Sequence, residues 1–146
     1  MKIVRDILRA KGAQPVWTVR PDETVYAALS LMADRNIGAV LVVDSGDPVG
    51  ILSERDYARK IVLKGLVSRQ ALVRDIMTSP VLYVRPARTV DECMALMTDK
   101  RIRHLPVIDE GRLVGIVSIG DLVKAQIADR DFMIEQLTDY ITGKLR

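Results

Sequence analysis

The stretch Val49-Gly50-Ile51-Leu52-Ser53-Glu54-Arg55-Asp56 has a second copy further along the chain, Val114-Gly115-Ile116-Val117-Ser118-Ile119-Gly120-Asp121. The correspondence extends outward at a constant offset, so that residues 16–62 align with residues 81–127 almost without gaps. Two copies of one supersecondary unit indicate a repeat architecture. We therefore predict a module with pseudo-two-fold symmetry and related sites between its halves.

The composition is that of a globular protein of about one domain's size. The chain has 146 residues, of which 49% are hydrophobic and 28% charged. Its longest apolar stretches, such as residues 37–43, are far shorter than the ~20 residues that cross a bilayer. The first residues, Met1-Lys2-Ile3-Val4-Arg5-Asp6, place charge where a secretory signal is apolar. We therefore expect a cytoplasmic protein that has no membrane partner.

The single cysteine and the scattered charges limit the chemistry. Cys93 excludes an intrachain disulfide and any multi-cysteine metal site, and its place on the apolar face of a predicted helix indicates a buried hydrophobe. The 22 Lys and Arg are interleaved with 19 Asp and Glu, whereas a nucleic-acid binder gathers basic residues on one face. The segment Lys100-Arg101-Ile102-Arg103-His104 and the pI near 9.2 keep nucleic-acid binding as the alternative function.

Each copy predicts the element order β-α-β-β-α, which is an α/β (α+β) fold. A short strand, residues 16–19 or 81–84, ends at Arg-Pro because proline disfavours helix at the residue before it. Apolar side chains at helical spacing then predict a helix with one buried stripe over residues 25–33 and 90–98. Thr89 and Glu92 form a capping-box pattern at the start of the second of these helices.

Two apolar runs and another helix complete each copy. The runs are residues 37–43 and 49–52 in the first copy, and 102–108 and 113–117 in the second. A short Gly-containing loop separates each pair, which predicts a β-hairpin. The following helices are expected from Glu54 to about Lys64 and from Ile119 to about Ala128.

Further segments surround the copies. A short helix is expected from Lys2 to about Ala10, and an apolar stripe follows Asp131 at helical spacing. The stripe is expected to pack within the chain or against a second subunit, and the two sheets to pack on each other, because a sheet covered on one face needs cover on the other. The predicted domains are residues 4–65 and 73–129, followed by a C-terminal helix over residues 130–146.

The repeated pattern Gly-h-h-Ser-x-x-Asp, in which h is apolar, has two interpretations. Ser-x-x-Asp at a strand-to-helix junction is typical of a helix N-cap, where an acid is also favoured by the helix dipole. Alternatively, a carboxylate in the first helical turn accepts two hydrogen bonds from a vicinal diol such as ribose, as in dinucleotide folds. On that interpretation, the strand glycine lets a flat ligand approach the backbone.

The doubled pattern resembles a tandem pair of cystathionine β-synthase (CBS) domains, a Bateman module of the stand-alone bacterial signalling type. The resemblance runs from about Val4 to Ala128 and includes the lead-ins Val4-Arg5-Asp6-Ile7 and Val73-Arg74-Asp75-Ile76, and the segment 101–109. It implies a regulatory module that binds AMP, ADP, ATP, NAD or S-adenosylmethionine in two clefts between the copies. It also implies a homodimer, shaped as a flat disc, that signals to an unidentified effector protein.

The resemblance assigns roles to residues of this chain. Ser53 and Asp56 are expected to hold ribose in one cleft, and Ser118 and Asp121 in the other. The Asp56 cleft is expected to be completed from the second copy by Pro80, Val81, Ile102, Arg103 and His104. The Asp121 cleft is expected to be completed by Pro15, Val16, Ile37, Gly38 and Ala39. The apolar residues and Gly38 among these form the expected adenine pockets.

The charged residues predict unequal clefts. Arg55, Arg59, Arg103 and His104 are expected to bind phosphate beside Asp56, whereas Lys124 is the cation on the Asp121 helix. Because arginine grips phosphate bidentately, the Asp56 cleft should prefer the more highly phosphorylated ligand. The Asp121 cleft should bind more weakly or take an uncharged part of a ligand.

These charged residues also have structural interpretations. Arg55 and Arg59 fit a solvated helix face equally well, and His104 a structural hydrogen bond. The first copy has Leu41 where the second has Pro106, which bears on the geometry of its second strand. Catalysis is not expected, because Cys93 falls on a buried stripe and His104 at a strand entry, which does not make a nucleophile and base pair.

Overall fold

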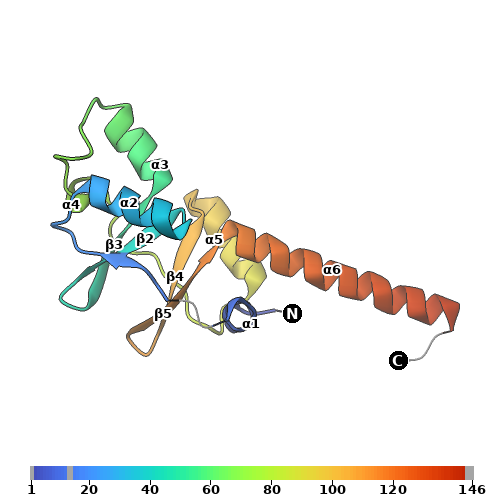
Figure 1. The fold of residues 1–146 in the computed structure, drawn as a ribbon. Coiled ribbons are helices and arrows are strands. Elements are labelled where there is room, and N and C mark those ends of the chain that lie inside the picture. The colour runs from blue at the N-terminus through green and yellow to red at the C-terminus, as the bar shows by residue number, and fades with distance from the viewer. Residues whose placement is uncertain (1, 13–14, 144–146) are drawn as a thin grey trace. The chain divides into compact units, whose positions relative to one another are not determined.

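The computed structural model describes residues 2–12 and 15–143. The chain divides into two compact units (Figure 1). The repeat-1 unit is Pro15–Tyr83, and the repeat-2 unit combines Met1–Gln14 with Val84–Arg146. The mixed α+β architecture of two repeats confirms the predicted fold class. Within the described ranges, every helix is too short or too polar to traverse a lipid bilayer.

The repeat-1 unit contains a three-stranded sheet in the order β1-β2-β3. Strand β1 runs parallel to β2, with Thr18 opposite Leu41, and β2 runs antiparallel to β3. Its elements are β1 (Thr18–Val19), α2 (Val25–Arg35), β2 (Ala39–Asp44), β3 (Asp47–Ser53), α3 (Glu54–Asp56), the π-helix η1 (Tyr57–Val62) and α4 (Val73–Ile76).

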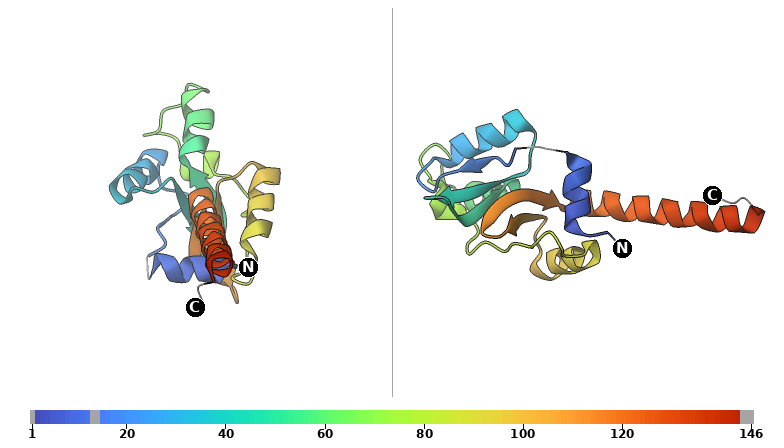
Figure 2. Two further views of the ribbon diagram at one scale, coloured as in Figure 1. Left: turned by 90° about the vertical axis from the view of Figure 1, so that its right-hand side faces the viewer. Right: turned by 90° about the horizontal axis from the view of Figure 1, so that it is seen from below.

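The repeat-2 unit contains a two-stranded antiparallel sheet, β4-β5. The long helix α6 follows β5 directly and extends beyond α5 of the same unit, as two views show (Figure 2). Its elements are α1 (Val4–Lys11), α5 (Val90–Lys100), β4 (His104–Asp109), β5 (Arg112–Ser118) and α6 (Ile119–Thr142).

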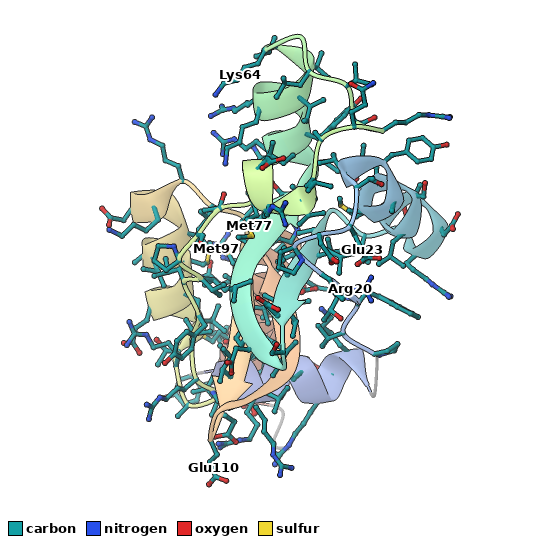
Figure 3. The ribbon with its side chains drawn as sticks, turned by 90° about the vertical axis from the view of Figure 1, so that its left-hand side faces the viewer. Arg20, Glu23, Lys64, Met77, Met97 and Glu110 are labelled. Carbon is teal, nitrogen blue, oxygen red and sulfur yellow. The ribbon has the colours of Figure 1, made fainter. Side chains whose placement is uncertain are left out.

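The two hairpins have the same register and confirm the predicted pairs of strands. Ala39 lies opposite Ser53 in one, and His104 lies opposite Ser118 in the other. Each tight turn has two residues with positive φ, as a type I′ hairpin turn requires. These are Ser45-Gly46 (51° and 85°) and Glu110-Gly111 (51° and 77°), and Figure 3 marks Glu110 at its hairpin tip.

Helices α2 and α5 bury the predicted stripes in separate cores, except for the last residue of each stripe, Ala33 and Thr98, which is exposed. Val25, Ala28 and Met32 belong to the repeat-1 core, and their counterparts Val90, Cys93 and Met97 to the repeat-2 core. The predicted capping box at α5 is confirmed, because Thr89 Oγ1 accepts from Glu92 N at 3.1 Å and Glu92 Oε1 accepts from Thr89 N at 3.2 Å. Burial of Cys93 is also confirmed.

The lead-in segments form helices α1 and α4, and each packs on the other repeat, not on the repeat that it precedes in sequence. Val4 and Ile7 of α1 are part of the repeat-2 core, and Val73 and Ile76 of α4 are part of the repeat-1 core. Equivalent backbone bonds attach them: Val4 N donates to Arg88 O at 2.8 Å, as Val73 N donates to Glu23 O at 2.8 Å. The lead-in of one copy therefore completes the unit of the other copy.

The predicted strand over residues 81–84 is wrong. Only an isolated parallel bridge, Val84 to Val107, takes its place. In the first copy Leu41 N donates to Trp17 O at 3.4 Å, but the counterpart of Leu41 is Pro106, which has no N–H. Since the β4–β5 register is the same as that of β2–β3, this substitution removes a ladder bond and leaves the hairpin unchanged.

Two helix predictions also need correction. The helix expected to end near Ala128 continues without interruption to Thr142 and includes the apolar stripe after Asp131. The helix after β3 is α-helical only over Glu54–Asp56 and then widens to a π-helix that ends at Val62. The helical spacing of apolar residues in the sequence does not distinguish an α-helix from a π-helix over so few turns.

Candidate functional site

The repeated Ser-x-x-Asp pattern forms two equivalent strand-to-helix corners, which we call the Asp56 corner and the Asp121 corner. In both, the serine is the last residue of a strand and the N-cap of a helix, with extended backbone angles (φ −117° at Ser53 and −103° at Ser118). The serine and aspartate then bond reciprocally as a capping box. The structural interpretation of the pattern as a helix cap is therefore confirmed.

At the Asp56 corner, both carboxylate oxygens accept hydrogen bonds. Oδ2 accepts from Ser53 N at 3.0 Å and from the Ser53 hydroxyl at 3.1 Å. Oδ1 accepts from the Thr78 hydroxyl at 3.1 Å and pairs with Lys60 Nζ at 3.2 Å. The Asp56 side chain is 13% exposed, so its charge is compensated within a largely buried setting.

The partners of Asp56 also hold the end of the α4 lead-in. Lys60 Nζ donates to Ile76 O at 2.9 Å, at the C-terminus of α4. Two residues further on, Thr78 and Ile51 exchange backbone bonds of 2.9 and 3.0 Å, which attach this segment to β3. The carboxylate, the lysine and the lead-in therefore form one connected network.

At the Asp121 corner, the cation comes from the α1 lead-in. Lys11 Nζ donates to Asp121 Oδ2 at 2.9 Å and to Ile116 O at 3.0 Å. Ser118 N donates to the same oxygen at 2.9 Å. The two bonds from Lys11 thus fix the last residue of α1 against β5 and the first turn of α6, and the bond from Ser118 N orients the carboxylate.

The pKa of Asp121 reflects this network. Partial burial raises the pKa of the carboxyl, but the hydrogen bonds from the Ser118 backbone and the Lys11 ammonium, together with the Lys11 charge, outweigh that cost. The pKa therefore lies below its usual range. The group is a carboxylate at neutral pH and can accept hydrogen bonds only.

The strand glycines do not leave the open space that a flat ligand needs. A Cβ on Gly50 would lie 2.5 Å from Met77 Sδ, and one on Gly115 would lie 2.6 Å from Leu8 Cδ2. Met77, marked in Figure 3, follows α4, and Leu8 belongs to α1. The expectation that these glycines admit a ligand is corrected: they admit the lead-in side chains.

The predicted cleft residues fall in both units. Pro80 and Val81 lie in the same unit as Asp56, and Thr78 beside them contacts its carboxylate. Gly38 O accepts from Glu54 N at 3.1 Å, and Arg103 O accepts from Ile119 N at 2.8 Å. These strand entries therefore lie against the helix start of their own repeat, and their predicted pairing with the corner of the other copy remains a prediction.

The remaining predicted residues are placed as follows. Ile37 and Ile102 pack against the core of their own unit, and Ala39 lies opposite Ser53 in the β2–β3 ladder. Arg59 and Arg103 are exposed, as is Lys124 on α6, whereas Arg55 and His104 are half-buried. Pro15 is exposed and Val16 half-buried before β1. Their adenine and phosphate roles stay predictions.

Three functional candidates were missed from the sequence. Thr78 and Lys60 contact Asp56, and Lys11 contacts Asp121. Lys60 was recognisable, because it lies four residues after Asp56 on the same helix. Lys11 gave no local signal, since it is 110 residues from its partner and reaches it only because α1 packs on the second repeat.

Neither a reactive cysteine nor a metal-binding cluster accompanies the two corners in the part of the chain that the structure describes. Burial raises the pKa of the Cys93 thiol, which makes it a poor nucleophile at neutral pH. No group of three or more His, Cys, Asp and Glu able to hold a metal ion occurs among residues 2–12 and 15–143. The corners therefore offer carboxylates, hydroxyls and ammonium groups for binding.

Comparison with known proteins identifies the family. The CBS domain family matches residues 4–63 and 73–128. The chain is 40% identical over an alignment of 148 residues to the mitochondrial CBS domain-containing protein CBSX3 of Arabidopsis thaliana. The alignment covers 96% of this chain and 72% of the relative. The chain is 34% identical to the CBS domain-containing protein YhcV of Bacillus subtilis, with 88% of this chain and 89% of the relative covered.

Solved structures give the same result. A putative signal-transduction protein with CBS domains from Burkholderia ambifaria has a TM-score of 0.84 and 52% identity, with 88% of this chain and 96% of that chain covered. A CBS domain pair crystallised with methylthioadenosine and S-adenosylmethionine has a TM-score of 0.77 and 27% identity, with 88% and 98% covered. The chain therefore belongs to the CBS domain family, as a tandem pair of CBS domains.

Proposed function

We propose that this CBS pair is a regulatory module that binds an adenosine-containing small molecule at the Asp56 and Asp121 corners. The observation that carries the proposal is the pair of equivalent carboxylates, each partly buried at a helix start and each beside a lysine. A carboxylate held in this way is a preorganised acceptor for the two hydroxyls of ribose. The complex of a similar CBS pair with methylthioadenosine and S-adenosylmethionine supports the same ligand class.

The two corners would accept ribose differently. At Asp121 the contacts described above end on Oδ2, which leaves Oδ1 to accept from a ligand hydroxyl. At Asp56 a ribose must exchange with Thr78 or Lys60 on Oδ1. Lys60, Arg55 and Arg59 share one short helical segment, which supports a preference of this corner for the more highly phosphorylated ligand.

The function is proposed to be regulation without catalysis. A ligand acts by binding one arrangement of the protein better than another, so its effect equals its difference in affinity for the two. A CBS pair that binds a nucleotide in this way needs no nucleophile or general base. Turnover of ATP or NAD by the purified chain would contradict this part of the proposal.

The direct test is thermal unfolding and calorimetric titration with adenosine, AMP, ADP, ATP, NAD, S-adenosylmethionine and methylthioadenosine. A ligand at about a hundred times its dissociation constant stabilises a protein by about 2.7 kcal/mol. Asp56→Ala and Asp121→Ala should each remove one site. Thr89→Ala is the matched control, because it breaks a capping box away from both corners and should lower stability without changing affinity.

Further variants separate ribose from phosphate contacts. Arg103→Ala and Arg59→Ala should weaken ATP binding more than adenosine binding, and an equal loss for both ligands would refute the phosphate assignment. Absence of binding by every adenosine compound would refute the proposed function as a whole. Retention of an RNA or DNA shift near physiological salt would instead favour the nucleic-acid alternative.

A further inference from the structure

The segment that follows the Asp56 corner concentrates positive charge. Residues 57–74 contain five Lys and Arg and no Asp or Glu, whereas the rest of the chain has 17 Lys and Arg against 19 Asp and Glu. The segment therefore carries a formal charge of +5, and all other residues together carry −2. Such a local excess of one sign attracts partners of the opposite sign.

The middle of this segment, residues 62–67, also exposes aliphatic side chains, and we call it the tip. Ile61, directly before it, is 1% exposed and belongs to the repeat-1 core. The aliphatic residues of the tip are 50% to 78% exposed: Leu66, Val67, Val62 and Leu63. Lys64 lies between these two aliphatic pairs, and Figure 3 marks it at the end of its unit that lies away from the sheet. Contiguous exposed apolar side chains of this kind mark an interaction site.

Backbone hydrogen bonds hold the tip at both ends. Leu66 N donates to Ile61 O at 3.0 Å, across a turn at Gly65, whose φ of 69° lies in the left-handed region that favours glycine. Directly after the tip, Ser68 O accepts from Tyr26 N at 2.9 Å, which attaches the chain to α2. The aliphatic side chains are therefore presented to solvent by a hydrogen-bonded turn.

Cations and an aromatic ring flank the tip. The guanidinium carbon of Arg69 lies 4.4 Å from the centroid of the Tyr26 ring, and this tyrosine is 45% exposed. Arg59, four residues before Leu63, is a further exposed cation. Tyrosine rings and basic side chains beside apolar groups are typical of protein surfaces that lie at the level of lipid headgroups.

We propose that the tip is a peripheral contact for an anionic lipid surface. The four aliphatic side chains enter the headgroup region, while Arg59, Lys64 and Arg69 bind lipid phosphates. Burial of apolar surface and attraction to anionic lipids together determine the strength of such a contact. It departs from the expectation that the chain has no membrane partner, because that expectation considered only segments long enough to cross a bilayer. It goes beyond nucleotide binding and does not depend on it.

Other partners fit the tip less well. The tip of a second copy carries the same charge, so that two tips repel each other. Single-stranded nucleic acid stacks its bases on aromatic side chains, whereas residues 62–67 are aliphatic apart from Lys64 and Gly65. An acidic protein would need a groove shaped to receive a protruding turn. A lipid surface needs no such preformed shape and offers both the negative charge and the apolar environment.

Flotation of the intact chain with vesicles, without nucleotide, tests the contact. We expect binding to phosphatidylcholine vesicles that contain phosphatidylglycerol, weaker binding at high salt, and no binding to phosphatidylcholine alone. Lys64→Gln should lower the partition coefficient about fivefold. Arg112→Gln is the matched control, because it removes the same charge from an exposed position on β5 and should change nothing. Absence of binding to the anionic vesicles, or equal behaviour of the two variants, would overturn the proposal.

A second variant tests the apolar part of the contact. The double substitution Leu63→Ser and Leu66→Ser should lower the partition coefficient at least about tenfold, because it removes apolar side chains that lipid would bury. Val114→Ser is its control, since Val114 is 45% exposed on β5 and lies outside the tip. Unchanged binding of the double variant would mean a purely electrostatic contact and overturn the proposal. So would release of the parent protein from the vesicles by RNA near physiological salt. Absence of nucleotide binding by a chain that binds the vesicles would contradict the proposed function alone.

Discussion

Removal of Lys11 tests whether the α1 lead-in is held by its charge. Lys11 Nζ lies 2.9 Å from Asp121 Oδ2, and the two side chains are 28% and 23% exposed. Hydrogen bonds to charged groups contribute about 1.5–3 kcal/mol when buried, and exposed ion pairs about 0.2–1 kcal/mol. For this half-buried pair, a double-mutant cycle of Lys11→Met and Asp121→Asn should give a coupling of about 1–2 kcal/mol at neutral pH.

The pH dependence of this coupling follows from the pKa of Asp121. Its folded-state pKa is lowered, whereas its unfolded pKa is about 3.9. The unfolded state therefore binds the proton more readily, and the stability that the pair contributes is complete above the unfolded pKa. It is lost as the pH falls through the folded pKa. In Lys11→Met the pKa of Asp121 should rise, which makes this variant less sensitive to acid than the parent.

Urea unfolding followed by circular dichroism is the appropriate assay. The single tryptophan, Trp17, lies in the repeat-1 unit, so its fluorescence does not follow the unit that contains Lys11. The matched control is Arg20 with Asp22, a pair at 3.2 Å whose side chains are 73% and 62% exposed. Its coupling should be at most about 0.5 kcal/mol. A Lys11–Asp121 coupling no larger than the control, or one that persists at acid pH, would refute the reasoning.

Three other variants or treatments test the fold. Gly50→Ala should destabilise the protein by about 1–3 kcal/mol, because its Cβ would overlap Met77, and Met77→Ala should restore part of that loss in urea unfolding. Thr89→Ala should cost about 1 kcal/mol by the same measurement, since it removes the α5 N-cap; no change would mean that the cap is replaced. The buried Cys93 should react with a thiol reagent only as fast as the protein opens, and rapid reaction of the folded protein would contradict its burial.

Much of the fold could be predicted because the same local sequence patterns occur in both copies. The hairpins, the stripes of α2 and α5, and the Thr89 capping box depend on residues close together in sequence. The strand expected at residues 81–84 failed for a different reason: its ladder bond requires an N–H from position 106, which is a proline. Such a loss is visible only when the two strands are known to be neighbours.

The site was predictable in part for the same reason. Ser53, Asp56, Ser118 and Asp121 lie within their own motifs, and their capping geometry is a local property. The pairing of Asp121 with Lys11 depends on a lead-in that packs on the distant repeat, and no spacing rule spans that separation. The roles of Gly50 and Gly115 were misinterpreted for the same reason, because the side chains that pack on them come from the distant lead-in segments.

The two corners thus connect each carboxylate to a lead-in helix by different routes. At Asp121 the lysine belongs to the lead-in α1 itself, whereas at Asp56 the lysine belongs to η1 and reaches the end of α4 through Ile76 O. If ribose binds these carboxylates as proposed, it replaces a contact of Asp56 with Thr78 or Lys60, and at Asp121 it shares the carboxylate with Lys11. Because linkage is reciprocal, whatever strengthens lead-in packing must then alter ligand affinity by the same factor. On the proposed function, the lead-ins are therefore the elements that nucleotide binding at the two corners would affect.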